Sequence, residues 1–337
     1  MAQPVKAASV GIGWWSGVLA DAVAKTDALE IVTCFTRSPE KRSAFAQKYG
    51  CQAAESYEAV LGDSSVEAVL LTTPHSAHRE QIEAAAQAGK HVFVEKPLAH
   101  TVKAAKAAAT ACERAGVVLS VGHSRRHQSA ARKLKALIED GTLGQVITAE
   151  ANLSYGMALT LDASKWRSTR TESPGGPLTS LGIHHLDTLS YLLGPIARIS
   201  AFSKRLASPV DIDDAVTAIL EFESGPLAYV GSNFATPRLF YLNVYGTEAN
   251  AFAEAEGSKL FLQKKGSEER EAVELGEAVD IILEEMEEFG RCVRAGSRPE
   301  VSGPEGVQAI AAVEAIVRSA ETGKTVKLKE LIGKFGG

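Results

Sequence analysis

HVFVEKP, from His91 to Pro97, follows a glycine break at position 89 and predicts a short buried strand. The stretch ends in a carboxylate, an amine and a proline. The packing of a buried strand does not require charged residues at its end. Charged Glu95 and Lys96 at the carboxyl end of a strand indicate the crevice where open α/β sheets bind ligands. Pro97 fixes its own φ and keeps Lys96 out of the α region, which makes the position of the amine reproducible. The alternative is a surface ion pair beside a helix-starting proline.

The bulk composition is that of an ordinary globular protein. The 337 residues are enough for two domains, and 45% hydrophobic and 23% charged residues are typical of soluble chains. The net charge of −5 argues against nucleic acid or an anionic membrane as a partner. We expect no cleaved leader, because the amino-terminal sequence lacks a charged segment followed by an apolar core, and the sequence contains no apolar run of about 18 residues. The scattered cysteines favour reduced thiols and a cytoplasmic location; they are Cys34, Cys51, Cys112 and Cys292.

A glycine-rich loop follows the first predicted strand, residues 6–13. The sequence GIGWWSG comes directly before an apolar-periodic segment at residues 18–24. Strand, glycine turn and helix form the context in which such a loop binds a dinucleotide. Gly11 would allow the tight turn, and Gly13 would let the pyrophosphate approach the helix amino terminus. Ser16 replaces the third glycine, and because it is small and polar it can cap the helix.

Two adjacent tryptophans, Trp14 and Trp15, are unusual in a loop of this kind. If they are exposed, they flank a bound cofactor. Alternatively, one or both pack beneath the loop. The sequence leaves both interpretations open.

The second predicted strand, residues 29–36, ends in Thr36 and Arg37, and a helix follows from Ser38-Pro39. Proteins that prefer NAD usually place Asp or Glu at this point to hold the ribose 2′-hydroxyl. The guanidinium of Arg37 instead suits a 2′-phosphate, because it is always charged and offers a planar fork of donors. We therefore predict NADP as the preferred cofactor, with NAD as the alternative.

The next predicted strand, residues 66–73, brings Thr73 and Pro74 to its carboxyl end, near the expected cofactor. His75 and His78 follow at the start of a helix. A spacing of three puts the two rings on neighbouring helix faces, an arrangement that a metal pair could use. Because the sequence shows no third ligand nearby, we predict hydrogen bonds at the helix start and no metal.

Strands and helices alternate through the first part of the chain. After the HVFVE strand, an alanine-rich helix is predicted at residues 101–115 and a strand at 117–121. The alternation predicts an α/β fold in which a doubly wound parallel sheet carries helices on both faces. A basic amphipathic segment, residues 123–144, follows as a predicted helix.

The second half is richer in strands. Runs separated by short polar or glycine turns predict hairpins and hence an antiparallel sheet. The predicted strands cover residues 145–155, 196–206, 215–223, 227–234, 240–245, 249–255 and 259–263. Two helices are predicted at 276–295 and 304–322, and the first keeps its apolar residues at helical spacing.

The stretch SPGGPLTSLGIHHLD contains the chemical groups of this half. A helix is predicted to begin around Leu181 and to carry His184, His185 and Asp187. Adjacent residues on a helix point about 100° apart, so the two histidines cannot face one pocket. We expect His185 and Asp187 to be structural or supporting, although Asp187 is close enough along the helix to touch the ring of His184.

Four stretches become specific when they are taken with the glycine loop: VEAVLLTTPHSAH, GKHVFVEKPLA, the pair Trp166-Arg167, and GGPLTSLGIHHLD. Together they resemble the glucose-fructose oxidoreductase, inositol dehydrogenase and MocA (Gfo/Idh/MocA) family over nearly the whole chain. The resemblance implies an amino-terminal NAD(P)-binding Rossmann domain, residues 1–122. It also implies a carboxyl-terminal α+β domain, residues 123–337, whose mostly antiparallel open sheet serves substrate binding and oligomerisation into homodimers or homotetramers.

The resemblance also implies several site features. The peptide before Pro97 is expected to be cis. His184 aligns with the family's catalytic histidine, and Arg126 with a position near the active-site cleft. Where the family often has an aspartate, four residues before the histidine, this chain has Ser180. A hydroxyl can orient the ring but brings no charge, which argues against a polyol dehydrogenase of the inositol kind.

We therefore expect an NAD(P)-dependent oxidoreductase that transfers a hydride between a nicotinamide and a hydroxyl-bearing carbon of a sugar, polyol or related small molecule. Lys96 and His184 are the expected catalytic residues, with Glu95 holding Lys96 in place. The expected cofactor-binding residues are Gly11, Gly13, Trp14, Trp15, Ser16, Thr36, Arg37, Thr73, Pro74, His75, His78, Glu95, Lys96, Arg126, Trp166 and Arg167. The alternatives are a dinucleotide-sensing binding protein on the same fold and a dehydrogenase of cyclic dihydrodiols or imines.

Overall fold

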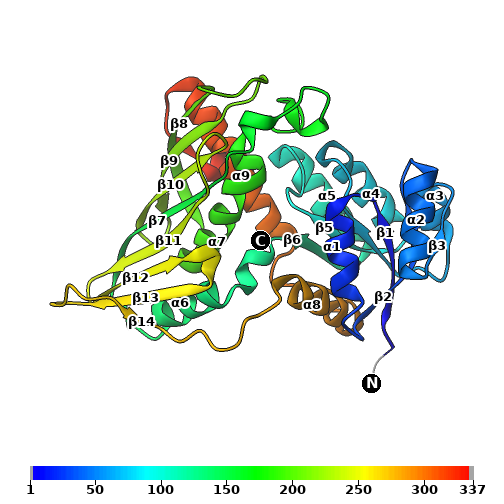
Figure 1. The fold of residues 1–337 in the computed structure, drawn as a ribbon, viewed down its shortest axis with the longest axis horizontal. Helices are drawn as coiled ribbons and strands as arrows, with labels where there is room; N and C mark the ends of the chain where they lie inside the picture. Colours follow the sequence, from blue (N-terminus) through cyan, green and yellow to red (C-terminus); the bar gives the residue numbers. More distant parts are fainter. Residues whose placement is uncertain (1–2, 334–337) are drawn as a thin grey trace. The chain divides into compact units, whose positions relative to one another are not determined.

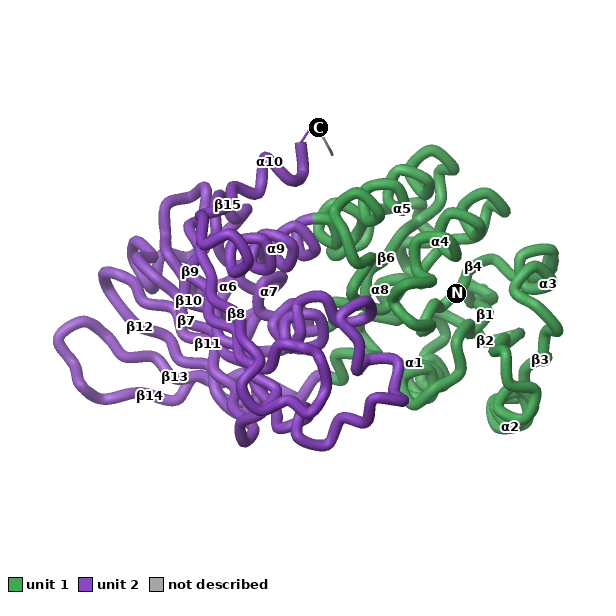
Figure 2. Tube along the Cα trace, turned by 90° about the horizontal axis from the view of Figure 1, so that it is seen from above, with its two compact units in different colours: residues 1–124, 280–307 green, residues 125–279, 308–337 purple. Residues whose placement is uncertain are grey.

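The computed structural model describes residues 3–333 and divides into two compact units (Figure 2). The first unit contains the chain up to Ser124 together with Asp280–Val307, and the second contains Arg125–Val279 and the residues from Gln308 onward. This division differs from the expected single boundary at residue 122. The segment 280–307, which the sequence analysis gave to the second domain, belongs to the first unit.

The first unit is built on a six-stranded, fully parallel sheet. The strand order β3-β2-β1-β4-β5-β6 is that of a Rossmann fold, as predicted. The strands are β1 (Val5–Val10), β2 (Leu29–Phe35), β3 (Gln52–Ala53), β4 (Ala68–Leu71), β5 (His91–Glu95) and β6 (Leu119–Gly122). Strand order reverses between β1 and β4, so ligands are expected at the carboxyl ends of these two strands.

Helices cover both faces of this sheet. They are α1 (Trp14–Val23), α2 (Pro39–Tyr49), α3 (Tyr57–Gly62), α4 (His78–Gln87), α5 (Val102–Ala115) and α8 (Ile281–Ala295). Ser38 and Thr101 cap α2 and α5 through their hydroxyl oxygens. Helix α8 joins this unit because Met286 and Phe289 pack into one apolar core with Leu19 and Phe93.

The second unit is built on a nine-stranded sheet with the order β14-β13-β12-β11-β7-β10-β9-β8-β15. All neighbouring pairs are antiparallel except β7 and β10, so the predicted mostly antiparallel sheet is confirmed. The strands are β7 (Val146–Ser154), β8 (Ile196–Lys204), β9 (Ala215–Phe222), β10 (Leu227–Asn233), β11 (Leu239–Gly246), β12 (Ala249–Glu254), β13 (Lys259–Lys264), β14 (Glu271–Ala272) and β15 (Val326–Lys327). In β9 buried and more accessible residues alternate, as expected for a sheet with one covered face.

Helices of the second unit lie beside one face of this sheet (Figure 1). They are α6 (Ser129–Glu139), α7 (Ile183–Leu193), α10 (Leu328–Ile332) and the greater part of α9 (Gly303–Thr322). The basic segment 123–144 is not the single helix that we predicted, because a 3-10 turn over Ser124–His127 precedes α6. No helix among residues 3–333 is long and apolar enough to cross a membrane.

Candidate active site

The glycine loop after β1 has the geometry that close approach of an anion requires. Gly11 has a φ of +93°, and a Cβ atom there would lie 2.7 Å from the backbone nitrogen of Thr73. A Cβ atom on Gly13 would meet no atom within 4 Å, so this side of the loop is open. Helix α1 begins at the next residue, and its first turn carries no acidic side chain. The N–H groups of this turn therefore favour a negatively charged group such as a pyrophosphate.

Ser16 occupies the place of the third glycine. Its hydroxyl accepts a hydrogen bond from the Gly13 N–H at 2.9 Å and donates one to the Gly13 carbonyl at 2.8 Å. The side chain is buried. Ser16 therefore stabilises the start of α1, as the sequence analysis expected.

The two tryptophans of the loop have different environments. The Trp14 side chain is 80% exposed, whereas Trp15 is half-buried and packs against the core that contains Phe93 and Phe289. The indole N–H of Trp15 donates to Oε1 of Glu95. Trp14 thus stays on the loop surface, and Trp15 packs beneath it.

Glu95 and Lys96 lie at the carboxyl end of β5. Within Val92–Ala99, Lys96 is the one residue that is not buried. The Lys96–Pro97 peptide is cis, which confirms the expectation drawn from the resemblance. Glu95 is 9% exposed and accepts a hydrogen bond from Trp15, a partner that the sequence analysis did not foresee.

His78 connects the ends of two neighbouring strands of the first unit. Its Nδ1 lies 2.8 Å from the carbonyl oxygen of Pro97, and its Nε2 lies 3.1 Å from the carbonyl oxygen of Thr73. The side chain is fully buried, and the ring of His75 lies 5.7 Å from it between centroids. Both ring nitrogens of His78 face carbonyl oxygens, which agrees with the hydrogen bonding predicted at the helix start.

The turn after β2 combines a buried and an exposed arginine. Arg42 is 8% exposed, and its Nη1 donates to the carbonyl oxygens of Thr36 at 3.3 Å and Glu55 at 3.4 Å. Its Nη2 pairs with the Glu55 carboxylate at 3.2 Å. Arg37 is exposed, and within residues 3–333 its guanidinium makes no hydrogen bond or ion pair. The turn is therefore held by Arg42, while Arg37 remains available to a ligand.

Two residues form the accessible side of the segment that leads into α7. Between Gly175 and Leu189 every residue is buried except Ser180 and His184. Ser180 belongs to a π-helical turn, Leu178–Gly182, that precedes α7 in place of the regular start predicted at Leu181. Such turns are frequent at functional sites.

His185 is buried, whereas the preceding residue, His184, is partly exposed. The His185 side chain is fully buried, its ring lies 5.3 Å from the ring of Phe240, and its Nε2 has no partner among the described residues. Burial, together with the nearby positive charge of Arg125, lowers the pKa of His185 to about 3. His185 is therefore a neutral core residue, in agreement with the structural role predicted for it.

Asp187 is paired with Arg126. Nε of Arg126 donates to Oδ2 at 2.8 Å and Nη2 donates to Oδ1 at 2.6 Å, and both side chains are buried. The Arg126 guanidinium also lies 5.3 Å from the centre of the Tyr191 ring. Arg126 thus anchors α7 inside the second unit, a role that the sequence analysis did not assign to it, and its role in cofactor binding stays a prediction.

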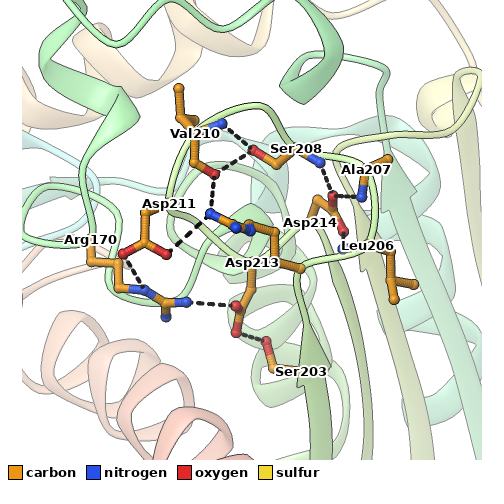
Figure 3. A network of polar contacts seen from close by, with 10 residues as sticks. Arg170, Ser203, Leu206, Ala207, Ser208, Val210, Asp211, Asp213 and Asp214 are labelled. Atoms are coloured by element: carbon orange, nitrogen blue, oxygen red, sulfur yellow. Dashed lines mark hydrogen bonds and ion pairs between the residues drawn. The ribbon is translucent and has the colours of Figure 1, made fainter.

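Trp166 and Arg167 lie on an exposed 3-10 turn, Trp166–Ser168, of the second unit, and the guanidinium stacks 4.6 Å from the indole. A nearby network holds the chain after this turn (Figure 3). Arg170 pairs with Asp213 at 3.1 Å and with Asp211 at 3.4 Å. These contacts tie the Trp166–Ser168 turn to the β8–β9 connection.

Two family models match the chain. An oxidoreductase family model with an NAD-binding Rossmann fold, GFO_IDH_MocA, matches residues 5–123, and the GFO/IDH/MocA C-terminal domain model matches residues 131–252. The chain belongs to the GFO/IDH/MocA oxidoreductase family.

Members of the GFO/IDH/MocA family resemble the chain over most of its length. A scyllo-inositol 2-dehydrogenase (NAD(+)) of Bacillus subtilis is 31% identical over 264 residues, 72% of each chain. A 1,5-anhydro-D-fructose reductase of Ensifer adhaerens is 29% identical over 311 residues, 89% of this chain and 91% of the relative. The crystal structure of a putative NADPH-dependent oxidoreductase from Desulfitobacterium hafniense is 36% identical, with a TM-score of 0.94 over 99% of this chain and 100% of that one.

This GFO/IDH/MocA member is therefore an oxidoreductase that uses a nicotinamide dinucleotide, as the motifs predicted. Sequence reasoning missed the contacts that hold the predicted residues, namely Trp15 with Glu95, His78 with Pro97, and Arg42 with Thr36. The paired tryptophans were a signal for the first of these contacts. The other two contacts involve His78 and Arg42, and no sequence pattern distinguishes these residues from exposed ones.

Proposed function

We propose that this enzyme transfers a hydride between NADP and a hydroxyl-bearing carbon of a sugar, a polyol or a related small molecule. The observation that carries the proposal is that Lys96 and His184, an amine and an imidazole, are partly exposed although their neighbours in sequence are buried. A bound nicotinamide supplies the hydride acceptor or donor at its C4 atom. The chain then has to orient the substrate and move one proton.

Lys96 is the residue we assign to the reacting oxygen. Its amine donates a hydrogen bond to that oxygen and carries the proton that leaves or enters it. His184, in the second unit, is the residue we assign as a further acid, base or binding group, and Ser180 lies on the same accessible side of its segment. A positioned proton-transfer group contributes a rate factor of about 10² to 10⁴.

The residues at the end of β2 support NADP over NAD. No carboxylate stands at Thr36 or Arg37 to hold a ribose 2′-hydroxyl, and the guanidinium of Arg37 is exposed and unpaired within residues 3–333. A planar, permanently charged fork of donors suits a 2′-phosphate. The pyrophosphate of the dinucleotide would lie at Gly11 and Gly13.

The proposal is tested by steady-state kinetics at 340 nm with NADP and NAD against a panel of aldoses, inositols, anhydro sugars, dihydrodiols and imines. We expect turnover with a lower KM for NADP, and we expect Lys96→Ala to lose kcat by about 10² to 10⁴ while the Kd of NADP stays near normal. Lys103→Ala, which changes an exposed lysine on α5, is the control and should keep both values. Loss of NADP binding in Lys96→Ala would make Lys96 structural.

The same experiment distinguishes an enzyme from a protein that binds the dinucleotide only as a sensor. Cofactor fluorescence that responds to NADP without turnover across the whole panel would favour the sensor. The 1,5-anhydro-D-fructose reductase among the relatives makes carbonyl reduction one direction that the panel has to include.

We also propose a cytoplasmic homo-oligomer. The four cysteines are free, which supports a reducing compartment. The uncovered face of the second sheet exposes large apolar side chains on three adjacent strands: Leu227 (48%), Ile219 (49%) and Phe202 (76%). An exposed apolar patch of this kind supports a contact with a second copy of the chain, which light scattering on the purified protein tests.

A further inference from the structure

Trp15 links the glycine loop to the end of strand β5. It is the second residue of α1, and its indole N–H donates to Oε1 of Glu95. The ring is half-buried and packs against the apolar core of the first unit, which includes Phe93 and Phe289. Because this packing restricts the indole, the hydrogen bond has a fixed direction.

The Glu95 carboxylate is also confined by the neighbouring strand. Glu95 and Gly122 are register partners in the β5–β6 pair. A Cβ atom on Gly122 would lie 3.0 to 3.2 Å from all three carboxylate atoms of Glu95, so a larger residue at position 122 would displace the carboxylate. Glu95 therefore occupies a narrow slot with the Gly122 backbone beside it and the Trp15 donor on its Oε1.

From these contacts we infer that Trp15 is a positioning residue for the reaction: it fixes Glu95 and thereby the amine of the adjacent Lys96. A buried carboxylate needs hydrogen-bond donors, and a weakly held Glu95 would leave the next residue less well placed. Trp15 acts from the turn of α1 that we assign to the pyrophosphate, so one helix turn serves both the cofactor and the proton-transfer group. The inference rests on the proposed function of Lys96.

The main test is Trp15→Phe, which keeps an aromatic ring in the core but removes the N–H donor. We expect kcat to fall roughly tenfold, because small misplacements of a reacting group cost rate, and the Kd of NADP to stay within about twofold. Tyr57→Phe is the matched control. It removes another buried aromatic donor of the same unit, the 2.8 Å bond from Tyr57 Oη to the Gln81 carbonyl, and should leave kcat unchanged.

A double-mutant cycle separates positioning from general destabilisation. If Trp15 acts through Glu95, then Trp15→Phe has no further effect on kcat in a Glu95→Ala background. An additive loss in the double variant, or a wild-type kcat in Trp15→Phe, would overturn the inference. If Glu95→Ala does not fold, Glu95→Gln, which removes the charge and so weakens the hydrogen bond from the indole, replaces it in the cycle. The combined loss should then still be smaller than the product of the two single losses.

A second measurement does not depend on turnover. The chain has three tryptophans, so the ¹H–¹⁵N spectrum contains three indole signals, and Trp15→Phe identifies one of them. We expect that signal to move on Glu95→Gln, and we expect Trp15→Phe, but not Tyr57→Phe, to change the rate at which trinitrobenzenesulfonate labels Lys96. An indole signal insensitive to Glu95, or an unchanged labelling rate, would overturn the inference. If instead the panel shows no turnover while both responses appear, the proposed function fails and the link from Trp15 to Lys96 stands.

Discussion

At the scale of single residues, the pair His184 and His185 shows what a local rule can and cannot predict. The 100° turn between neighbouring helical residues predicted that the two rings have different surroundings, and the burial of the two residues agrees. The rule does not say which ring is inside. That depends on the strand residue Phe240, which is far away in the sequence.

The burial of His185 makes a prediction about pH. Its pKa is about 3 in the folded chain and near 6.5 when unfolded, so the unfolded state takes up a proton first as the pH falls. Stability from this residue is therefore complete above pH 6.5 and is lost progressively as the pH falls from 6.5 towards 3. Between pH 7.5 and 5.5 the loss amounts to about 1.4 kcal/mol.

His185→Gln, which does not titrate, should remove this part of the pH dependence. Urea unfolding of both proteins at pH 7.5 and pH 5.5 measures it, and other titrating groups cancel in the comparison. The wild-type chain should lose about 1.4 kcal/mol more than the variant. Equal losses would mean that His185 takes up its proton equally in the folded and unfolded chains, so that folding does not lower its pKa.

At the scale of elements, strands and helices with clear periodicity were predicted from the sequence within a few residues. The strand expected at 215–223 is β9 (Ala215–Phe222), and the helix expected from Thr101 is α5 (Val102–Ala115). Short elements such as β3 and α3, and the π turn before α7, were missed. Two to six residues carry too little periodicity for a prediction, and contacts with distant parts of the chain determine their geometry.

The prediction at the scale of elements concerns Arg170, which holds the segment that follows Trp166. Arg170 is 52% exposed, so its pairs with Asp211 and Asp213 add little to global stability. They do tie the turn to the β8–β9 connection, where buried Asp214 accepts hydrogen bonds from the N–H groups of Leu206 and Ala207 (Figure 3). If this turn contacts substrate, Arg170→Ala should raise the substrate KM several-fold with little change in the cofactor KM.

Arg318→Ala is a suitable control for that experiment. Arg318 is 53% exposed and pairs with Glu314 on α9, in the same unit. Both variants should unfold within about 1 kcal/mol of the wild-type chain. Equal substrate KM values for the two variants would exclude a role of the Arg170 network in holding the turn for substrate.

At the scale of the whole molecule, the position of a helix along the chain did not predict which of the two units it belongs to. Helix α8 follows the last strand of the hairpin region, and its apolar face has the same spacing that any core-facing helix would have. Periodicity shows that a helix has a buried face but not which sheet covers it. The structure assigns α8 to the first unit, where Phe289 packs against Phe93 with 5.9 Å between ring centroids.

Because α8 belongs to the first unit, a cavity made in α8 should destabilise the first unit rather than the second. Phe289 is fully buried, so Phe289→Ala should destabilise the chain by about 3 to 5 kcal/mol. The loss of hydrogen-exchange protection should fall on β1, α1 and β5 of the first unit, and NADP should bind more weakly because its site needs that unit folded. Phe222→Ala, an equally buried phenylalanine on β9, should instead loosen the second unit. If Phe289→Ala loosened β9 before β1, α8 would belong to the other unit, and the glycine loop would depend on the first 124 residues alone.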